Sequence, residues 1–263
     1  MAEGEYDMKL LVISDIHSNI WALDKILDTE KNFDLLCCAG DLVDYGTAPG
    51  QVVDCMRQYS SNVLVQGNHD LHAVEIWKQD QYRDVVPEKF KWVHHNCQRL
   101  DEDRIHYLEQ LPLRVTFEAD GYVYMIQHQF DNAYGLVESR HQFDEFWKQH
   151  AEPEYKNSKK RRMIFGHTHR QCIHVLDQDM LWLNPGSASY RRPDDPDKTA
   201  HYAVVENGEI QLRRVSYDRS HCLEEAIKLN QVHGMMKTEL QDFFFFFGDA
   251  ETSRDPLPLE PEK

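Results

Sequence analysis

Apolar residues in the first 111 positions gather in short runs, and the stretches between the runs carry apolar residues at helical spacing. The runs predict three buried strands, at Lys9–Ser14, Leu35–Ala39 and Val63–Gln66. A helix is predicted after each strand: from Asn19 to about Glu30, from Pro49 to about Tyr59, and after Asp70, with two more between 88 and 111. This strand-then-helix rhythm predicts a partly parallel sheet covered by helices.

The second half of the chain is richer in antiparallel strands. The turn Ala119-Asp120-Gly121 predicts a hairpin of Arg114–Phe117 with Tyr122–Gln127, and the turn at 206–209 predicts one of Tyr202–Val205 with Ile210–Val215. Further strands are expected at Met163–Phe165 and Leu181–Leu183. Two mixed sheets packed face to face, with helices outside, account for both halves. The expected fold is therefore α/β, in a single domain spanning residues 1–248.

Three C-terminal segments and one basic run need a separate interpretation. Leu223–Gly234 is predicted to be a helix, and Phe243–Phe247 is five phenylalanines in a row. That run is either a buried terminal segment or a surface for a partner, and burial is favoured. The acidic, proline-rich tail 249–263 is expected to be disordered. The basic run Lys159–Arg162 is interpreted as a solvated loop, not as a nuclear or RNA-binding signal.

The overall charge restricts the partners. The formal net charge of −16 over 263 residues repels nucleic acid and anionic membranes, so neither is expected to bind, whereas a small phosphorylated substrate needs local positive charge. No apolar run is long enough to span a bilayer, and the N-terminus has no apolar signal core. The six cysteines show no paired spacing, and the adjacent Cys37 and Cys38 are expected to be core thiols. A cytoplasmic protein is predicted, and a homo-oligomer is left open.

Polar residues that can bind a metal ion follow almost every predicted strand. The carboxyl ends of strands in open α/β sheets surround a crevice, and loops there carry ligands. Carboxylate, amide and imidazole groups without thiolates suit two ions of the Mn, Fe or Zn type rather than a structural zinc cage. A carboxylate can bridge two cations with its two oxygens, and a pair of cations about 3.5–4 Å apart acidifies a shared water and clamps a phosphoryl oxygen. The segments concerned are Asp15-Ile16-His17, Gly40 to Gly46, Gly67-Asn68-His69-Asp70, His128, Gly166-His167-Thr168-His169 and Asn184-Pro185-Gly186-Ser187.

In this order the segments resemble the blocks of the calcineurin-like metallophosphoesterases: D-x-H, G-D-x-x-D, G-N-H-D/E, a lone His, and G-H-x-H. The resemblance covers about residues 8–215 and implies a four-layer α-β-β-α sandwich. It assigns the first metal to Asp15, His17, Asp41 and His169, and the second to Asp41, Asn68, His128 and His167. It also implies that His69 is the general acid and that Asp44 hydrogen-bonds to it and raises its pKa. The two divalent ions are expected to be Mn or Fe, with Zn, Ni or Co as alternatives.

The resemblance implies a phosphoesterase in which a hydroxide shared by the metals attacks phosphorus in line. The substrate is expected to be a small phosphodiester or phosphomonoester, nucleotides included. Hydrolysis of dinucleoside polyphosphates, protein phosphatase activity and a non-catalytic scaffold of this fold stay open as alternatives. Tyr45 stands where the protein phosphatases and diadenosine tetraphosphatases carry Arg, and Gln129 stands where relatives often have Gly. Candidate substrate contacts are Asn68, Arg191, Arg192, and the backbone near Gly186 and Ser187.

Overall fold

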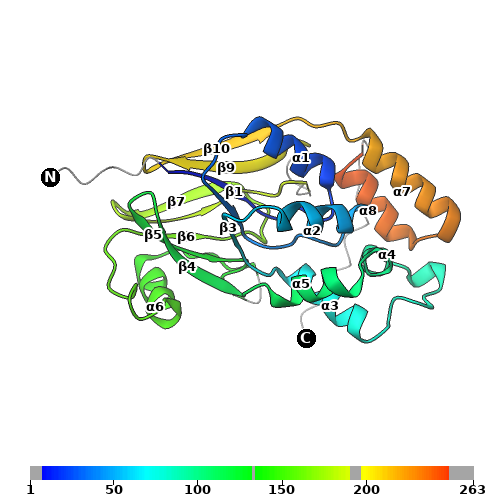
Figure 1. Cartoon of the computed structure of the whole chain (residues 1–263), viewed down its shortest axis with the longest axis horizontal. Coiled ribbons are helices and arrows are strands. Elements are labelled where there is room, and N and C mark those ends of the chain that lie inside the picture. The colour runs from blue at the N-terminus through cyan, green and yellow to red at the C-terminus, as the bar shows by residue number, and fades with distance from the viewer. Residues whose placement is uncertain (1–7, 132–133, 190–196, 249–263) are drawn as a thin grey trace, which may run out of the picture.

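The computed structural model describes residues 8–131, 134–189 and 197–248, and Figure 1 shows two sheets flanked by helices. The strands are β1 Lys9–Ile13, β2 Leu35–Cys38, β3 Asn62–Leu64, β4 Arg114–Ala119, β5 Tyr122–Gln127, β6 Arg161–Ile164, β7 Cys172–Asp177, β8 Met180–Asn184, β9 Ala200–Glu206 and β10 Glu209–Val215. The helices are α1 Ile20–Thr29, α2 Pro49–Arg57, α3 Asn68–Lys78, α4 Trp92–Arg99, α5 Glu102–Gln110, α6 Arg140–His150, α7 Ser220–His233 and α8 Lys237–Phe246, with a short 3₁₀ turn η1 at Pro87–Lys89.

Both sheets are mixed, as the sequence predicted. The first has the strand order β10-β9-β1-β2-β3, in which β1, β2 and β3 are parallel and β9 runs antiparallel to β1. The second has the order β4-β5-β6-β8-β7, in which β5, β6 and β8 are parallel. The two predicted hairpins are the antiparallel pairs β4–β5 and β9–β10. Six parallel strands therefore end at comparable positions in two sheets.

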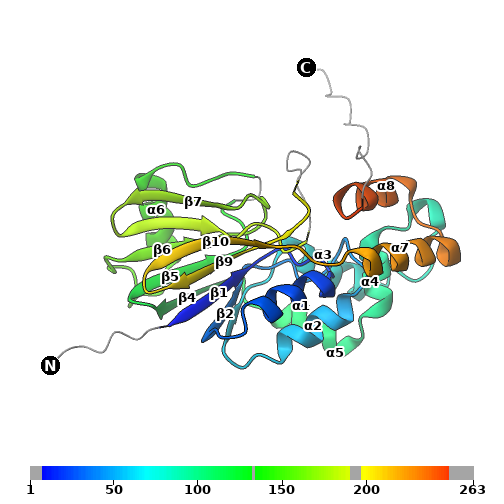
Figure 2. The ribbon, with the colours of Figure 1, turned by 90° about the horizontal axis from the view of Figure 1, so that it is seen from above.

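The layers are α-β-β-α, which confirms the expected sandwich. The apolar runs of the parallel strands are buried on both faces, because alternate residues point to different cores. In β1, Leu11 and Ile13 pack against the helices on the first sheet, whereas Leu10 and Val12 pack between the two sheets. Helix α6 covers the second sheet through Phe143 and other apolar residues, and it lies apart from the other helices in Figure 2. Among the described residues, no helix is long and apolar enough to cross a membrane.

Cys37 and Cys38 in β2 illustrate this two-sided burial. Cys37 points into the core between the sheets, and Cys38 points into the core beneath the helices. Both thiols are free and fully buried, and burial raises their pKa well above its usual range. The prediction that they are core thiols is confirmed.

The interpretation of Lys159–Arg162 as a solvated loop is wrong for its second half, because Arg161 and Arg162 begin β6. Arg162 is only 4% exposed. Its guanidinium lies 3.4 Å from the ring centroid of Tyr122 and donates hydrogen bonds to Tyr124 Oη at 2.9 Å and to the carbonyl of Gly208 at 2.7 Å. A buried arginine needs such a set of acceptors and an aromatic face, and these come from residues distant in sequence.

The phenylalanine run is buried, as predicted, in a cluster formed by α4, α7 and α8. Its first four residues form the last turn of α8, which places them around the helix instead of along a strand. Phe243 is 2% exposed, and its ring centroid lies 4.6 Å from those of Trp92 and Phe247. In Figure 2 the helices α7 and α8 form the end of the molecule opposite the N-terminus. The expected disordered tail, 249–263, lies outside the described residues.

Burial of this cluster predicts a stability loss on truncation. Phe243→Ala should lower the free energy of unfolding by about 3–5 kcal/mol, because it removes a ring from a closed core and leaves a cavity. Phe244→Ala is the matched control, since Phe244 is only partly buried, and it should cost clearly less. Urea unfolding followed by circular dichroism measures both. Equal losses would contradict the placement of Phe243 at the centre of the cluster.

Candidate metal centre

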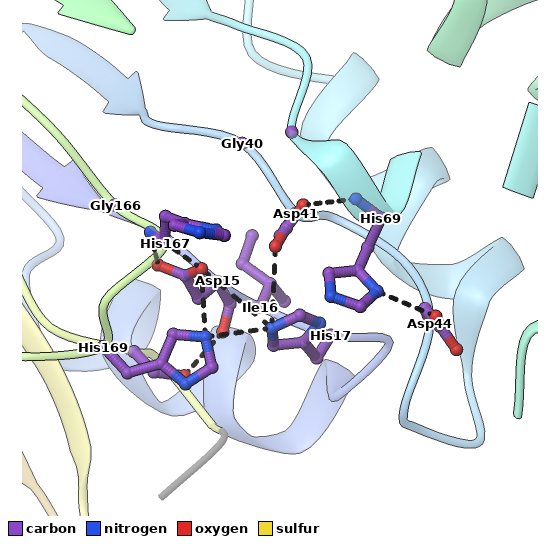
Figure 3. Close-up of polar contacts among 12 residues, drawn as sticks. Asp15, Ile16, His17, Gly40, Asp41, Asp44, His69, Gly166, His167 and His169 are labelled. Atoms are coloured by element: carbon purple, nitrogen blue, oxygen red, sulfur yellow. Dashed lines mark hydrogen bonds and ion pairs between the residues drawn. The ribbon is translucent and has the colours of Figure 1, made fainter. Parts of the chain in front are cut away.

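The predicted ligands meet where six parallel strands of the two sheets end. Asp15, Asp41 and Asn68 follow β1, β2 and β3 of the first sheet, whereas His128 and His167 follow β5 and β6 of the second. Figure 3 shows most of these side chains directed toward a common centre, with His69 and Asp44 on one side of Asp41 and His167 and His169 on the other. The sandwich thus assembles, from segments far apart in sequence, the set that the order of motifs predicted.

The donors expected for the first cation are close neighbours. Asp15 Oδ1 lies 3.2 Å from His169 Nε2 and 4.0 Å from His17 Nε2, and the two imidazole nitrogens are 3.4 Å apart. Asp41 Oδ2 lies 3.8 Å from His17 Nε2. Asp15 and His17 are fully buried, so their polar atoms face one another instead of water.

The donors expected for the second cation form an adjacent group. His128 Nε2 lies 3.2 Å from Asp41 Oδ2 and 2.9 Å from Asn68 Oδ1. His167 Nδ1 lies 3.0 Å from the same Asn68 oxygen. Asp41 Oδ2 is therefore the atom that the two groups share.

These spacings fit metal coordination. Donors that bind one transition-metal ion at about 2.0–2.2 Å are about 3–3.5 Å from one another, and most of the distances above are near this range. Sequence reasoning allowed Asp41 to bridge with both oxygens, but the structure directs only Oδ2 between the groups. Asp41 Oδ1 instead accepts a hydrogen bond from the backbone N–H of His69 at 2.9 Å. A bridge would thus use a single oxygen.

Second contacts of the imidazoles determine which nitrogen can bind a metal. His128 Nδ1 donates to the carbonyl of Ala39 at 2.6 Å, and His17 Nδ1 lies 3.4 Å from the carbonyl of Val43. A carbonyl only accepts, so the proton of the neutral ring is on Nδ1 and the lone pair is on Nε2, which faces the cluster. The residues present therefore fit two divalent cations of the expected type.

The electrostatics of the cluster are those of a site that needs positive charge. Burial lowers the pKa of His17 to about 4 and also lowers that of His167, which leaves neutral ligands. Burial would also lower the pKa of His128, but the charge of Asp41 outweighs it and raises the pKa to about 10. The pKa of Asp41 is lowered, against the effect of burial, mainly by His128. Without a cation, protons on histidine balance the carboxylates, and a metal would replace those protons.

The backbone at the ligands is strained. Asp15, His17, Asp41, His167 and His169 have φ between 48° and 63°, in the left-handed region that residues with a side chain rarely adopt. Such strain costs on the order of 1 kcal/mol or more at each position and concentrates at functional sites. It turns the chain abruptly after each strand so that consecutive side chains reach different targets. His167 and His169 in this way lie in different donor groups although they are two residues apart.

Two glycines allow the loops after β2 and β3 to approach each other. A Cβ on Gly67 would lie 2.0 Å from Asp41 Oδ1, and a Cβ on Gly40 would lie 2.7 Å from the nitrogen of Gly67 and 2.9 Å from His128 Nδ1. Gly40 also has a φ of 91°. Glycine at both positions is therefore required by space as well as by conformation.

His69 and Asp44 form the pair that the sequence predicted. His69 Nδ1 donates to Asp44 Oδ2 at 2.9 Å, and Asp44 is buried. Burial would lower the pKa of His69, but the charge of Asp41, followed by the hydrogen bond to Asp44, raises it to about 9. The protonated form of His69 is thus favoured near neutral pH, and both Asp41 and Asp44 contribute to this.

Asp70 is a supporting residue to which sequence reasoning gave no role. Its carboxylate accepts hydrogen bonds from the N–H groups of Asp41 at 3.0 Å, Leu42 at 2.8 Å, Val43 at 3.1 Å and Gly67 at 2.9 Å. It is fully buried, and burial together with the charge of Asp41 raises its pKa to about 7. Asp70 therefore holds the loop after β2 against the start of α3. Its place in Gly67-Asn68-His69-Asp70 was the signal available in the sequence.

Asn96 in α4 is a second residue that the sequence did not reveal. Its side chain is fully buried, accepts from Ser18 Oγ and from the N–H of Asp44 at 3.0 Å, and donates to the carbonyl of Gly46 at 2.9 Å. It therefore fixes the loop that carries Asp44 and Tyr45. It lies within a helix pattern with no motif around it, so no signal pointed to it.

The structure places only some of the candidate substrate contacts at the site. The N–H of Gly186 donates to Asn184 Oδ1 at 2.8 Å, and Ser187 Oγ donates to the carbonyl of Asp15 at 2.8 Å. Ser187 thus supports the loop that carries Asp15. The Gly186 N–H is engaged by Asn184 and is not available to an oxyanion. Arg191 and Arg192 lie outside the described residues. Asn68 is in place at the second donor group.

Comparisons with known proteins bear on the family and the fold. The family described as calcineurin-like phosphoesterase superfamily domain matches residues 8–208. An uncharacterized protein of Methanocaldococcus jannaschii, MJ0912, is 27% identical over 240 residues, which cover 83% of this chain and 92% of the relative. A metallophosphoesterase from Sphaerobacter thermophilus has a similar structure, with a TM-score of 0.67, 20% identity and coverage of 90% of this chain and 98% of that one. The structure of the hypothetical protein PH1004 from Pyrococcus horikoshii OT3 is also similar, with a TM-score of 0.69 and 13% sequence identity. The match covers 91% of this chain and 98% of that one.

The role of Asp70 can be tested by removing one acceptor. Asp70→Asn turns an NH₂ group toward two backbone N–H donors, so the free energy of unfolding should fall by about 2–5 kcal/mol. Urea unfolding in the presence of a chelator measures this without a contribution from bound metal. Asp103→Asn is the matched control, because Asp103 pairs with Arg57 on the surface and its loss should cost less than about 1 kcal/mol. Similar losses in the two variants would contradict the support assigned to Asp70.

Proposed function

The chain belongs to the calcineurin-like phosphoesterase superfamily, and from that premise we propose that it is a two-metal phosphoesterase acting on small phosphodiesters or phosphomonoesters, nucleotides included. The observation that carries the proposal is the shared position of Asp41 Oδ2, which lies 3.8 Å from a nitrogen of one donor group and 3.2 Å from a nitrogen of the other. A carboxylate oxygen that faces both donor groups is placed to bridge a pair of cations.

Asp15, His17, Asp41 and His169 would hold one ion, and Asp41, Asn68, His128 and His167 the other. Mn or Fe suits this mixture of oxygen and imidazole donors, and Zn, Ni and Co are the alternatives to test. The cations would supply an activated water and positive charge for the phosphoryl oxygens. They would also make one place on an acidic protein attractive to an anionic substrate, since the whole chain carries a formal charge of −16.

The protein's own contribution to bond cleavage is a proton. In hydrolysis the water oxygen forms a new bond to phosphorus, and the bond from phosphorus to the leaving oxygen breaks. His69 would give its proton to that leaving oxygen, which departs as an alcohol. Asp44, 2.9 Å from Nδ1, orients the ring so that Nε2 can face the substrate. Asn96 holds the Asp44 loop and is therefore a positioning residue.

The alternative functions, enzymatic and non-enzymatic, have less support. The ring of Tyr45 lies 4.6 Å from that of His69. In the protein phosphatase branch this sequence position carries an arginine that binds phosphate. The tyrosine therefore disfavours a protein phosphatase. A non-catalytic scaffold of this fold needs neither the seven donors nor a general acid held by a buried carboxylate. The six free cysteines support the proposal of a cytoplasmic location.

Metal-dependent turnover tests the proposal. The purified protein, freed of metal and given Mn, Fe, Zn, Ni or Co, should hydrolyse bis-p-nitrophenyl phosphate or p-nitrophenyl phosphate, and elemental analysis should find two ions per chain. Asp41→Asn removes a negative charge that both ions would share, so it should weaken metal binding by more than about 100-fold and abolish turnover. Wild-type protein without turnover under any of these metals, or an Asp41→Asn variant that keeps both ions, would contradict the proposal.

The leaving group tests the acid. His69→Ala should lower kcat by about 100- to 10,000-fold on substrates with an alkoxide leaving group and much less on p-nitrophenyl esters, since p-nitrophenolate departs without a proton. The metal content should stay that of the wild type, because the His69 side chain is not among the donors. A loss of the same size for all leaving groups would argue that His69 has another role.

A further inference from the structure

One aromatic side chain next to the metal centre is unusually exposed. Tyr134 is 74% exposed, and its ring lies over that of His167, with centroids 4.7 Å apart and an angle of 14° between the planes. His167 covers one face of the tyrosine ring, and the high exposure of the side chain leaves the rest of the ring to solvent. An exposed tyrosine stacked flat on a predicted metal ligand is placed to contact whatever binds to that metal.

Other apolar side chains also lie beside His167. Leu136 is 38% exposed, and together with Phe130 and Phe165 it lines a small hollow beside His167. Phe130 packs on Phe165, with ring centroids 6.3 Å apart. We call Phe130, Tyr134, Leu136 and Phe165 the Tyr134 shelf. Of these, Phe165 belongs to the core beneath α6, and Phe130 packs against that core.

A second tyrosine borders the opposite side of the centre. The ring of Tyr45 lies 4.6 Å from that of His69 and 5.2 Å from that of His17, and it packs against the cluster of α4, α7 and α8. Figure 3 places His69 and His167 on different sides of Asp41. An aromatic ring is therefore present both beside the proposed acid and beside the far metal ligand.

A phosphodiester carries two ester groups, of which one is expelled and one is retained. We propose that the Tyr134 shelf is a stacking platform for an aromatic group, such as a nucleobase, on the retained ester group. The proposal rests on the proposed function, because His69 determines which ester group leaves. The leaving group must lie next to His69, and hence next to Tyr45, so the retained ester group extends toward His167. There the open face of Tyr134 offers the sequence-tolerant contact that aromatic side chains make with bases.

Substrates that share a leaving group distinguish stacking on Tyr134 from the step that breaks the ester bond. Bis-p-nitrophenyl phosphate, thymidine 5′-p-nitrophenyl phosphate and methyl p-nitrophenyl phosphate all expel p-nitrophenolate, but only the first two retain an aromatic group. Tyr134→Ala should raise KM about 5- to 10-fold for the first two, consistent with the loss of one stacking contact, and less than about 2-fold for the methyl ester. Tyr134→Phe should behave like the wild type, since it keeps the ring.

Binding without turnover gives an independent measurement. Calorimetric titration of the Mn-loaded protein with thymidine 5′-monophosphate and with methyl phosphate should show tighter binding of the nucleotide, and Tyr134→Ala should remove the difference. Val232→Ala truncates another exposed apolar residue, 73% exposed on α7, and should change neither quantity.

The outcomes distinguish the two proposals. Equal changes in KM for all three esters, a Tyr134→Phe variant as weak as Tyr134→Ala, or equal binding of the two monophosphates by the wild type would overturn the stacking platform while leaving the phosphoesterase intact. A nucleotide preference that depends on Tyr134 in a protein without turnover would support the platform and overturn the hydrolytic function.

Discussion

The arrangement of this molecule depends on the neutralisation of two buried carboxylates. Asp15 and Asp41 have almost no exposed surface, and the ion-pair partners that the described part of the chain gives them are histidine rings. Taking two like charges out of water costs several kcal/mol each unless opposite charge is close by. Asp70, a third carboxylate in the same place, is satisfied by four backbone N–H groups. Asp70 therefore belongs to the scaffold, whereas Asp15 and Asp41 are among the residues that could hold cations.

The sequence predicted the parallel strands and most of the helices, because their burial is imposed by local pattern. A strand between two layers must be apolar on both faces, so β1 and β2 appear as continuous apolar runs. Strand β7 was missed because it is the edge strand of its sheet and is at most half-buried, which leaves no run to detect. Helix α6 went unassigned, and the phenylalanine run was not expected to be helical, since five identical residues carry no period. Arg162 was misjudged because its buried environment comes from two other segments, strand β5 and the turn at Gly208.

The chemistry of the site was more predictable than its geometry. Donor residues could be identified because each follows a strand, and strand ends of parallel sheets meet at one edge. Left-handed φ at Asp15, Asp41 and His167 leaves no trace in composition, nor does the contact of Asn96 with a loop 50 residues away. The hydrogen bond from the Gly186 N–H to Asn184 Oδ1 likewise became visible only in three dimensions. Tyr134 is another such case, because it stacks on His167, a residue that is not its neighbour in the sequence.

Each proposed cation would take donors from both sheets, and this has a consequence for the lifetime of the protein. His17 and His169 are 152 positions apart in the chain, so an ion held by both would act as a reversible cross-link that closes most of the domain into one loop. Opening that loop would require release of the ion. The free energy of metal binding would therefore add to the free energy of the unfolding that exposes the chain to a protease. Turnover of the chain in a cell would then follow the supply of metal, with the metal-starved form degraded first.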